Sequence, residues 1–311
     1  MLEVLPLIAC ILIAFSIGSN DTSNAFGICI GAGIITFRRA VYLLGVFVFI
    51  GGILQGKNVM KTVGRELVSI NVLILSIALL VSAFMIVFAN WKRLPVSSHQ
   101  AIIGSLVGAG MALGASVRYD TLLKIIESWI ISPLGSMLLA MVVYSICEIL
   151  FRRMPLFKVE RILRTLLLLN GMIIAYNTGA NELATALGPI VYYGILTPIE
   201  AVAVGTLMLW LGAMCLSSRV IETVGKGITS LDAFSGFSAQ FSAGMNVLIF
   251  TTLGMPVSTT YCIIGGIMGV GILKGVETVR FDLLKRIMLS WILTPLLSFA
   301  TCYLISLLSI S

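Results

Sequence analysis

The chain has 311 residues, of which 59% are hydrophobic and only 11% charged, and its formal net charge is +7. A soluble domain carries about 25% charged residues, so this composition excludes one and predicts an all-α polytopic membrane protein. The apolar stretches do not alternate in polarity, which excludes a transmembrane β-barrel. Lys and Arg collect in short connections, which indicates membrane orientation and excludes a nucleic-acid partner.

Ten apolar segments follow one another along the chain, each long enough or nearly long enough to cross a bilayer. They cover residues 4–36, 40–56, 71–90, 97–115, 121–150, 163–193, 198–216, 233–253, 257–273 and 284–309. Two polar stretches, 57–70 and 217–231, follow the second segment of each group of five. We expect each to form a short amphipathic helix at the membrane interface.

Three blocks of the first half return in the second half at an almost constant distance. Residues 18–27 return as 179–188 and residues 95–98 return as 256–259, both 161 positions later. The block around Arg118 and Trp129 returns around Arg280 and Trp291, 162 positions later. We therefore predict a first repeat over residues 1–150, a cytoplasmic connector over 151–162 and a second repeat over 163–311, as in transporters built from repeats.

The basic residues predict how the chain is oriented. With the N-terminus outside and five spans in each half, most Lys and Arg residues fall in cytoplasmic connections, as the positive-inside rule requires. Five is an odd number, so the second half enters the membrane from the opposite face. The sequence thus predicts a multi-pass protein of the cell membrane, with inverted-topology repeats and both termini extracellular.

The first repeated block carries an acidic residue inside an apolar stretch, Asp21 in one half and Glu182 in the other. A buried acid in a membrane is unfavourable and marks an ion pathway or coupling site, although Asp and Asn also cap helices. We expect each helix to be broken here, because exposed carbonyls suit Na⁺ and free amides suit an anion. Neutral oxygen and amide groups come from Asn20, Asn24, Asn181 and Thr185.

The second repeated block offers hydroxyl groups after a proline. Ser97 and Ser98 in one half, and Ser258 and Thr259 in the other, precede a Gly-rich apolar helix. Such residues are natural N-caps. Hydroxyls and helix amides also form cradles for oxyanions. If the repeats bring all four motifs together, the result is a site for an oxyanion that is transported with cations.

Other candidate residues carry less chemistry. His99 is the single histidine, so no transition-metal site is expected around it. It could contact an anion or carry a proton. The six cysteines form no CxxC pair and predict packing residues rather than a disulfide framework.

These motifs resemble those of the inorganic phosphate transporter (PiT) family of cation-coupled phosphate symporters. The duplicated Gly-Ala-Asn-Asp-x-x-Asn signature is matched by residues 18–24 and less closely by 179–185, and the Pro-Val-Ser-Thr-Thr-His block is matched by 95–100 and 256–261. The resemblance implies an inverted-repeat fold and Na⁺ or H⁺ coupling. It implies phosphate contacts from Asp21, Asn24, Ser97, Ser98, Glu182, Thr185, Ser258 and Thr259, and Na⁺ contacts from Asn20, Asp21, Asn181 and Glu182.

The sequence departs from the family pattern at several of these positions. Glu182 and Thr185 stand where the family has Asp and Asn, and Gln100 and Tyr261 occupy the histidine positions. Gln240 lies where relatives often carry Glu. These changes leave open a sulfate permease of the same superfamily, and coupling to H⁺ instead of Na⁺.

The sequence therefore predicts a secondary active transporter that imports inorganic phosphate with Na⁺, or with H⁺, by alternating access. It predicts no enzyme activity, no cofactor and a possible homodimer in the lipid bilayer. Two other classes stay open, a membrane enzyme that uses Asp21 and Glu182 and a passive anion channel. The enzyme is disfavoured, because it needs asymmetric roles for its carboxylates, whereas these two occur in equivalent repeats. Dependence of uptake on a Na⁺ or H⁺ gradient separates a carrier from a channel.

Overall fold

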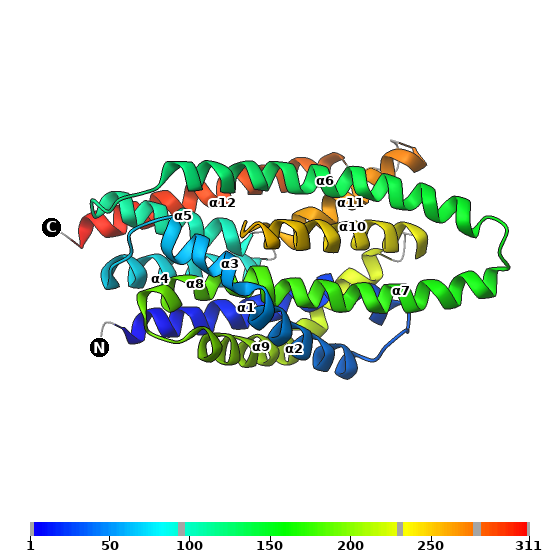
Figure 1. The fold of residues 1–311 in the computed structure, drawn as a ribbon, viewed down its shortest axis with the longest axis horizontal. Helices are drawn as coiled ribbons and strands as arrows, with labels where there is room; N and C mark the ends of the chain where they lie inside the picture. Colours follow the sequence, from blue (N-terminus) through cyan, green and yellow to red (C-terminus); the bar gives the residue numbers. More distant parts are fainter. Residues whose placement is uncertain (1–2, 93–96, 229–232, 276–280, 310–311) are drawn as a thin grey trace.

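The structure is a computed structural model that describes residues 3–92, 97–228, 233–275 and 281–309. Its described residues form a bundle of long helices (Figure 1). In the first half these are α1 (Val4–Gly31), α2 (Phe37–Leu54), α3 (Gly56–Lys61), the π-helical turn η1 (Thr62–Glu66), α4 (Val72–Lys92), α5 (Ser98–Ala112) and α6 (Tyr119–Phe151). In the second half they are α7 (Leu156–Asn177), the π-helical turn η2 (Thr178–Leu183), α8 (Ala184–Tyr193), α9 (Pro198–Ile228), α10 (Ala233–Thr252), α11 (Thr259–Lys274) and α12 (Phe281–Leu308).

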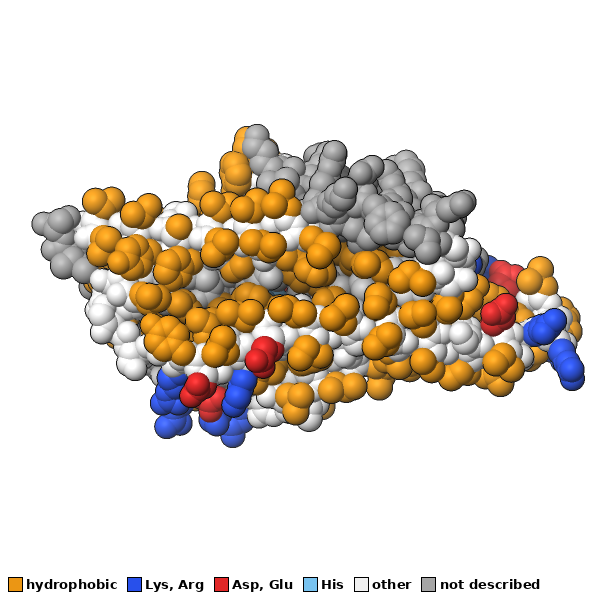
Figure 2. Space-filling model, turned by 90° about the horizontal axis from the view of Figure 1, so that it is seen from above, with side chains coloured by type: hydrophobic (Ala, Val, Ile, Leu, Met, Phe, Trp, Pro, Cys, Tyr) orange, Lys and Arg blue, Asp and Glu red, His pale blue; other side chains and the backbone are white. Residues whose placement is uncertain are grey.

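The predicted all-α membrane architecture is confirmed. Six helices are long and apolar enough to cross a bilayer within the described residues, namely α1, α2, α4, α6, α9 and α12. Hydrophobic side chains cover most of the face in Figure 2, and charged side chains gather toward its ends. The chain is a multi-pass membrane protein.

The fourth segment of each half is shorter than a full span. α5 has 15 residues and α11 has 16, so each extends about 22–24 Å, less than the roughly 30 Å hydrocarbon core. α5 runs back to the end of the bundle where α4 begins. There a β-bridge joins Val68, which precedes α4, to Val117, which follows α5. This α4–α5 hairpin enters and leaves from one side. Figure 1 accordingly shows both termini at one end of the bundle and the α6–α7 connection at the other.

The predicted break in the helix at residues 18–24 is wrong. α1 runs without interruption, and its hydroxyl groups bond carbonyls of the same helix instead of a ligand: Thr22 Oγ1 donates to Gly18 O at 2.8 Å, and Ser19 Oγ to Ser16 O at 2.7 Å. The second motif does depart from α-helical geometry, but as η2, which joins α7 to α8 without unwinding. Such π-helical turns occur often at functional sites.

The two polar stretches differ in structure. Residues 57–66 form α3 and η1, which pack on α8 through buried Val59 and Val63 and expose Lys57, Lys61 and Arg65, so their amphipathic character is confirmed. The prediction of a separate short helix is wrong for residues 217–228, because α9 continues to Ile228, and residues 229–231 lie outside the described residues. The side chains of this stretch lie outside the described residues.

The two halves pack against each other through equivalent glycine contacts. A Cβ atom on Gly18 would lie 1.8 Å from Leu209 O, and one on Gly179 would lie 1.9 Å from Val48 O, so only glycine fits at either place. Leu209 and Val48 are themselves 161 positions apart. A separation of 161 or 162 positions likewise relates three further pairs of contacts: Gly51 with Tyr176 and Gly212 with Phe15, Gly104 with Pro295 and Gly265 with Pro133, and Gly108 with Phe299 and Gly269 with Met137. Small residues allow this close approach of helices in membranes.

Candidate functional site

The structure brings the four repeated motifs together. Asn24 of α1 donates from Nδ2 to Thr260 Oγ1 of α11 at 3.0 Å. His99 Nε2 of α5 lies 2.9 Å from Asn181 Oδ1 of η2. α5 and α11 meet directly, because Tyr261 donates its hydroxyl proton to Gln100 Oε1 at 2.9 Å. The start of each short helix thus lies against the acidic motif of the opposite half.

The two acidic side chains lie next to each other. Asp21 and Glu182 are each 5% exposed, and their carboxyl groups are within interaction distance. Asn24 donates to Asp21 Oδ1 at 2.8 Å. Among the described residues neither acid forms an ion pair with Lys or Arg. Two adjacent carboxylates in a poorly hydrated site require a cation or a shared proton between them, so this arrangement is suited to a small cation.

The predicted cation ligands differ in how they are held. Asn181 is fully buried and makes four hydrogen bonds. Its Nδ2 donates to Thr251 Oγ1 at 2.8 Å and Met255 O at 3.0 Å, while its Oδ1 accepts from Val257 N at 3.0 Å and lies beside His99. Asn20 is half-buried at the equivalent position. Asn181 therefore joins η2 to the segment before α11, and its side chain has no free oxygen.

The hydroxyl residues stand at equivalent helix starts. Ser97 has φ −88° and ψ 122°, and Ser258 has φ −84° and ψ 118°, the extended backbone of an N-cap. Ser258 Oγ accepts from Tyr261 N at 3.5 Å, but Ser97 makes no such bond. The hydroxyls of Ser97 and fully buried Thr259 have no hydrogen-bond partner among the described residues, although Tyr261 lies near Ser97. Two buried donors are therefore available to a ligand.

The remaining predicted contacts are less free. Ser98 is half-buried in the first turn of α5. Thr185 is fully buried and donates its hydroxyl to Asn181 O at 2.8 Å, so it already has a backbone partner. All eight predicted phosphate contacts thus belong to the four motifs that meet, but they differ in how many unpartnered polar groups they offer to a ligand. They are Asp21, Asn24, Ser97, Ser98, Glu182, Thr185, Ser258 and Thr259.

Three contacts at this site were not predicted from the sequence. Gln240 Nε2 donates to Asn24 O at 2.7 Å and Ala25 O at 3.0 Å, which fixes α10 to the first motif. Thr260 accepts a hydrogen bond from Asn24, whereas the hydroxyl pattern in the sequence pointed to Ser258 and Thr259. Gln100 and Tyr261 are 161 positions apart, so the repeat distance could have predicted that they meet.

Comparisons with known proteins identify the family of this chain. The sequence profile of the phosphate transporter family matches residues 17–302. The chain is 36% identical to a candidate phosphate permease of Methanocaldococcus jannaschii, over 97% of this chain and 96% of that protein. It is 28% identical to the sulfate permease CysP of Bacillus subtilis, over 98% of this chain and 87% of that protein.

The fold agrees with a solved structure as well. A sodium-dependent phosphate transporter superposes with a TM-score of 0.83 at 25% identity, covering 98% of both chains. The matched residues 17–302 include all four motifs that meet at the acidic pair. The protein is therefore a transporter rather than an enzyme, and it belongs to the phosphate transporter family.

Proposed function

We propose that this protein imports inorganic phosphate together with Na⁺ by alternating access. The observation that carries the proposal is the meeting of opposite chemistries: two adjacent buried carboxyl groups lie beside two helix starts with unpartnered hydroxyls. Carboxylates attract a cation, while hydroxyls and helix amides attract an oxyanion. Because the cation neutralises the carboxylates, it also makes the site acceptable to an anion, which couples the two ligands.

The phosphate ion would lie between the starts of α5 and α11. Ser97 and Thr259 supply the unpartnered hydroxyls, and Ser98 and Ser258 line the same two helix starts. Asn24 and Thr185 would contact it from the opposite motifs after small rotations of their side chains. His99, 1% exposed and beside Asn181, would hold this motif in place rather than carry the transported proton.

The cation would lie between Asp21 and Glu182, with Asn20 as a further oxygen ligand. Asn181 would position these groups, because its four hydrogen bonds leave it no free oxygen. The sodium-dependent transporter of similar structure favours Na⁺ over H⁺. Two inverted halves, residues 1–150 and 163–311 joined by a cytoplasmic connector, would expose this site alternately to each side of the cell membrane, with both termini extracellular.

Sulfate is the second candidate substrate, because a sulfate permease is among the relatives and Glu182 and Thr185 depart from the family signature. The test is uptake of ³²P-phosphate into proteoliposomes, with imposed Na⁺ or H⁺ gradients and unlabelled sulfate as competitor. Accumulation driven by Na⁺ and resistant to sulfate supports the proposal. Accumulation driven only by H⁺ replaces the coupling ion, and entry of labelled sulfate without phosphate overturns the substrate.

A further inference from the structure

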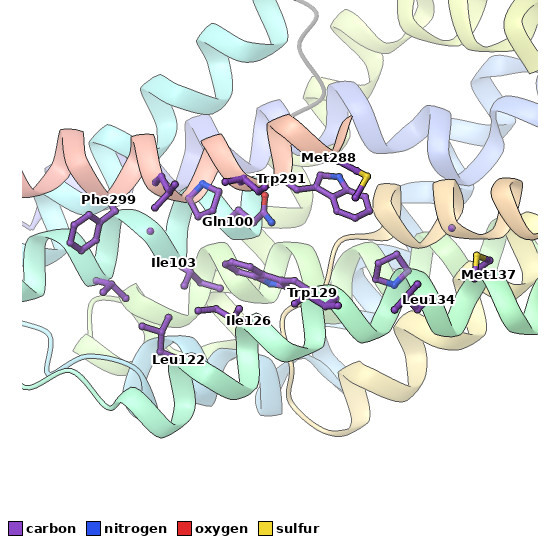
Figure 3. Close-up of a pocket in the computed structure, with 18 of the residues that line it drawn as sticks. Gln100, Ile103, Leu122, Ile126, Trp129, Leu134, Met137, Met288, Trp291 and Phe299 are labelled. Carbon is purple, nitrogen blue, oxygen red and sulfur yellow. The ribbon is translucent and has the colours of Figure 1, made fainter. Parts of the chain in front are cut away.

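A cavity of about 870 Å³ lies between α5, α6, α11 and α12. Figure 3 shows Trp129 of α6 and Trp291 of α12 on two sides of it, with Gln100 of α5 close to Trp291. Its lining residues are apolar apart from the Gln100 amide and the two indole groups, and none is charged. The cavity includes none of the acidic or hydroxyl residues of the transport site, so its ligand must be of another chemical class.

The cavity opens onto the lipid-facing surface of the protein. The lining residues Ile130 and Leu134 of α6 are 58% and 50% exposed, and Ile292 and Leu296 of α12 are 61% and 57% exposed. In a membrane-spanning chain these side chains face acyl chains. Pro133 and Pro295 stand at equivalent positions inside α6 and α12, and a proline removes one helical hydrogen bond and bends the helix. Both prolines line the cavity.

We propose that this cavity holds an acyl chain of a bilayer phospholipid whose phosphate group lies at the N-terminal end of α6. The volume is within the range of about 300–1,000 Å³ typical of sites for small ligands. A cavity of this kind is not filled by water, because apart from the Gln100 amide and the two indole groups its lining offers no hydrogen-bond partners. Hydrocarbon from the surrounding bilayer fits the lining and has direct access to it.

The headgroup end of the cavity has a matching positive charge. Leu122, in the first turn of α6, lines the cavity, and Arg118 precedes it by one turn as the N-cap of the helix. Arg118 is exposed and forms no ion pair with the described residues. The α6 N-terminus adds partial positive charge, although Asp120 opposes it in the first turn. Tyr119, 60% exposed, is an aromatic residue of the type that lies at the membrane–water interface.

The wall between this cavity and the transport site consists of paired contacts. Tyr261 bonds Gln100 at 2.9 Å and packs its ring on Trp291, with the ring centroids 4.4 Å apart. Trp129 Nε1 donates to Pro256 O at 2.9 Å, in the segment that leads into α11. A bound acyl chain would support both tryptophans from the membrane side. Loss of the lipid would therefore loosen the segment that carries Ser258 and Thr259.

The two tryptophans allow a direct test with the full-length protein. The chain has four tryptophans, and replacing the other two, Trp91→Phe and Trp210→Phe, leaves emission from the cavity alone. Detergent-solubilised protein is titrated with phosphatidylglycerol brominated in its acyl chains, since bromine quenches indole fluorescence on contact. We expect saturable quenching at a few lipids per protein, reversed by unbrominated phosphatidylglycerol. Quenching that rises linearly without saturation or competition would overturn the proposal.

Variants then locate the bound lipid. Val107→Phe places a larger side chain into the cavity from α5 and should remove the saturable quenching, whereas Leu138→Phe, on an exposed part of α6, should retain it. Arg118→Gln should weaken binding of brominated phosphatidylglycerol more than binding of brominated phosphatidylcholine. If a second copy of the chain filled the cavity instead, lipid would not quench and Val107→Phe would convert dimers to monomers in mass photometry. That pair of results would contradict the lipid site.

Discussion

The two acidic motifs occupy equivalent positions but have different backbones. The first lies in an uninterrupted α-helix, where the hydroxyl groups of Ser19, Thr22 and Ser23 all donate hydrogen bonds to carbonyls of the same helix. The second lies in the π-helical turn η2 and continues into α8, and Ala180, Leu183 and Ala184 replace all three of these hydroxyl residues. Its acid, Glu182, is one methylene longer than Asp21. Yet both carboxyl groups are equally buried and adjacent, which teaches that the repeats preserve the place of the charge rather than the backbone that carries it.

The largest expected effect comes from removing one of the two charges. Asp21→Asn should abolish Na⁺-driven phosphate uptake while the protein stays folded, because the cation loses one of its two carboxylate ligands. Uptake into proteoliposomes measures the loss, and thermal unfolding checks the fold. Glu3→Gln, at the exposed start of the same helix, is the matched control and should transport normally. Accumulation at the wild-type level in Asp21→Asn would contradict the site.

A smaller effect should follow from adding a methyl group where the halves meet. Gly18→Ala and Gly179→Ala would each place Cβ within 2 Å of a backbone carbonyl oxygen, so we expect a loss of about 1–3 kcal/mol in the free energy of unfolding, or more. Equal losses would show that the π-helical turn packs as tightly as the α-helix. Gly236→Ala is the control, because its Cβ would meet only Ile28 at 3.4 Å and alanine favours a helix. An unchanged melting temperature in Gly18→Ala would contradict this packing.

The two asparagines at the motif centres should differ in their structural effect. Asn181→Ala removes a side chain with four hydrogen bonds and leaves buried partners unsatisfied, so it should destabilise the protein by about 1–3 kcal/mol. Asn20→Ala, at the half-buried equivalent position, should destabilise less and act mainly on the Na⁺ dependence of uptake. Thermal unfolding and Na⁺ titrations of uptake separate the two. The reverse order of stability would show that the motifs exchange roles.

The smallest expected difference distinguishes the two serine caps. Ser258→Ala removes a long cap hydrogen bond and should lower stability by about 0.5 kcal/mol, whereas Ser97→Ala removes none. Both should raise the KM for phosphate, and Ser97→Ala should raise it more because its hydroxyl has no described protein partner. Unchanged KM in both variants would reduce these residues to helix caps.

The sequence predicted the helices well, because apolar length and flanking polar residues determine where a span begins and ends. α2, α6 and α12 begin and end within about three residues of the predicted segments. The predicted break in α1 was wrong: the helix continues to Gly31, and hydroxyl side chains of the motif bond carbonyls of their own helix. The same run of Ser and Thr residues is compatible with a broken helix and with a continuous one, so the sequence alone did not distinguish them.

The candidate site was predicted in composition but not in its internal connections. The repeat pointed to the four motifs, yet nothing in the letters showed that Asn181 would be saturated while Ser97 and Thr259 would be left without partners. Those differences depend on which loop passes beside each side chain. The loop before α11 supplies two of the atoms around Asn181, Met255 O and Val257 N, while Thr251 Oγ1 comes from the end of α10, and only the folded chain places them there.

The glycine contacts between the halves also have a consequence for biogenesis. Gly18 of α1 is covered by α9, and α2 is covered by Gly179 of η2, so the surfaces of each half are completed by helices of the other. During synthesis the first half enters the membrane long before α9 and η2 exist. Until the second half has been translated, the glycine-containing surfaces of the first-half helices must be covered by lipid or by the insertion machinery. Neither half should therefore mature alone, and two separately synthesised halves should regain function only when made in the same membrane.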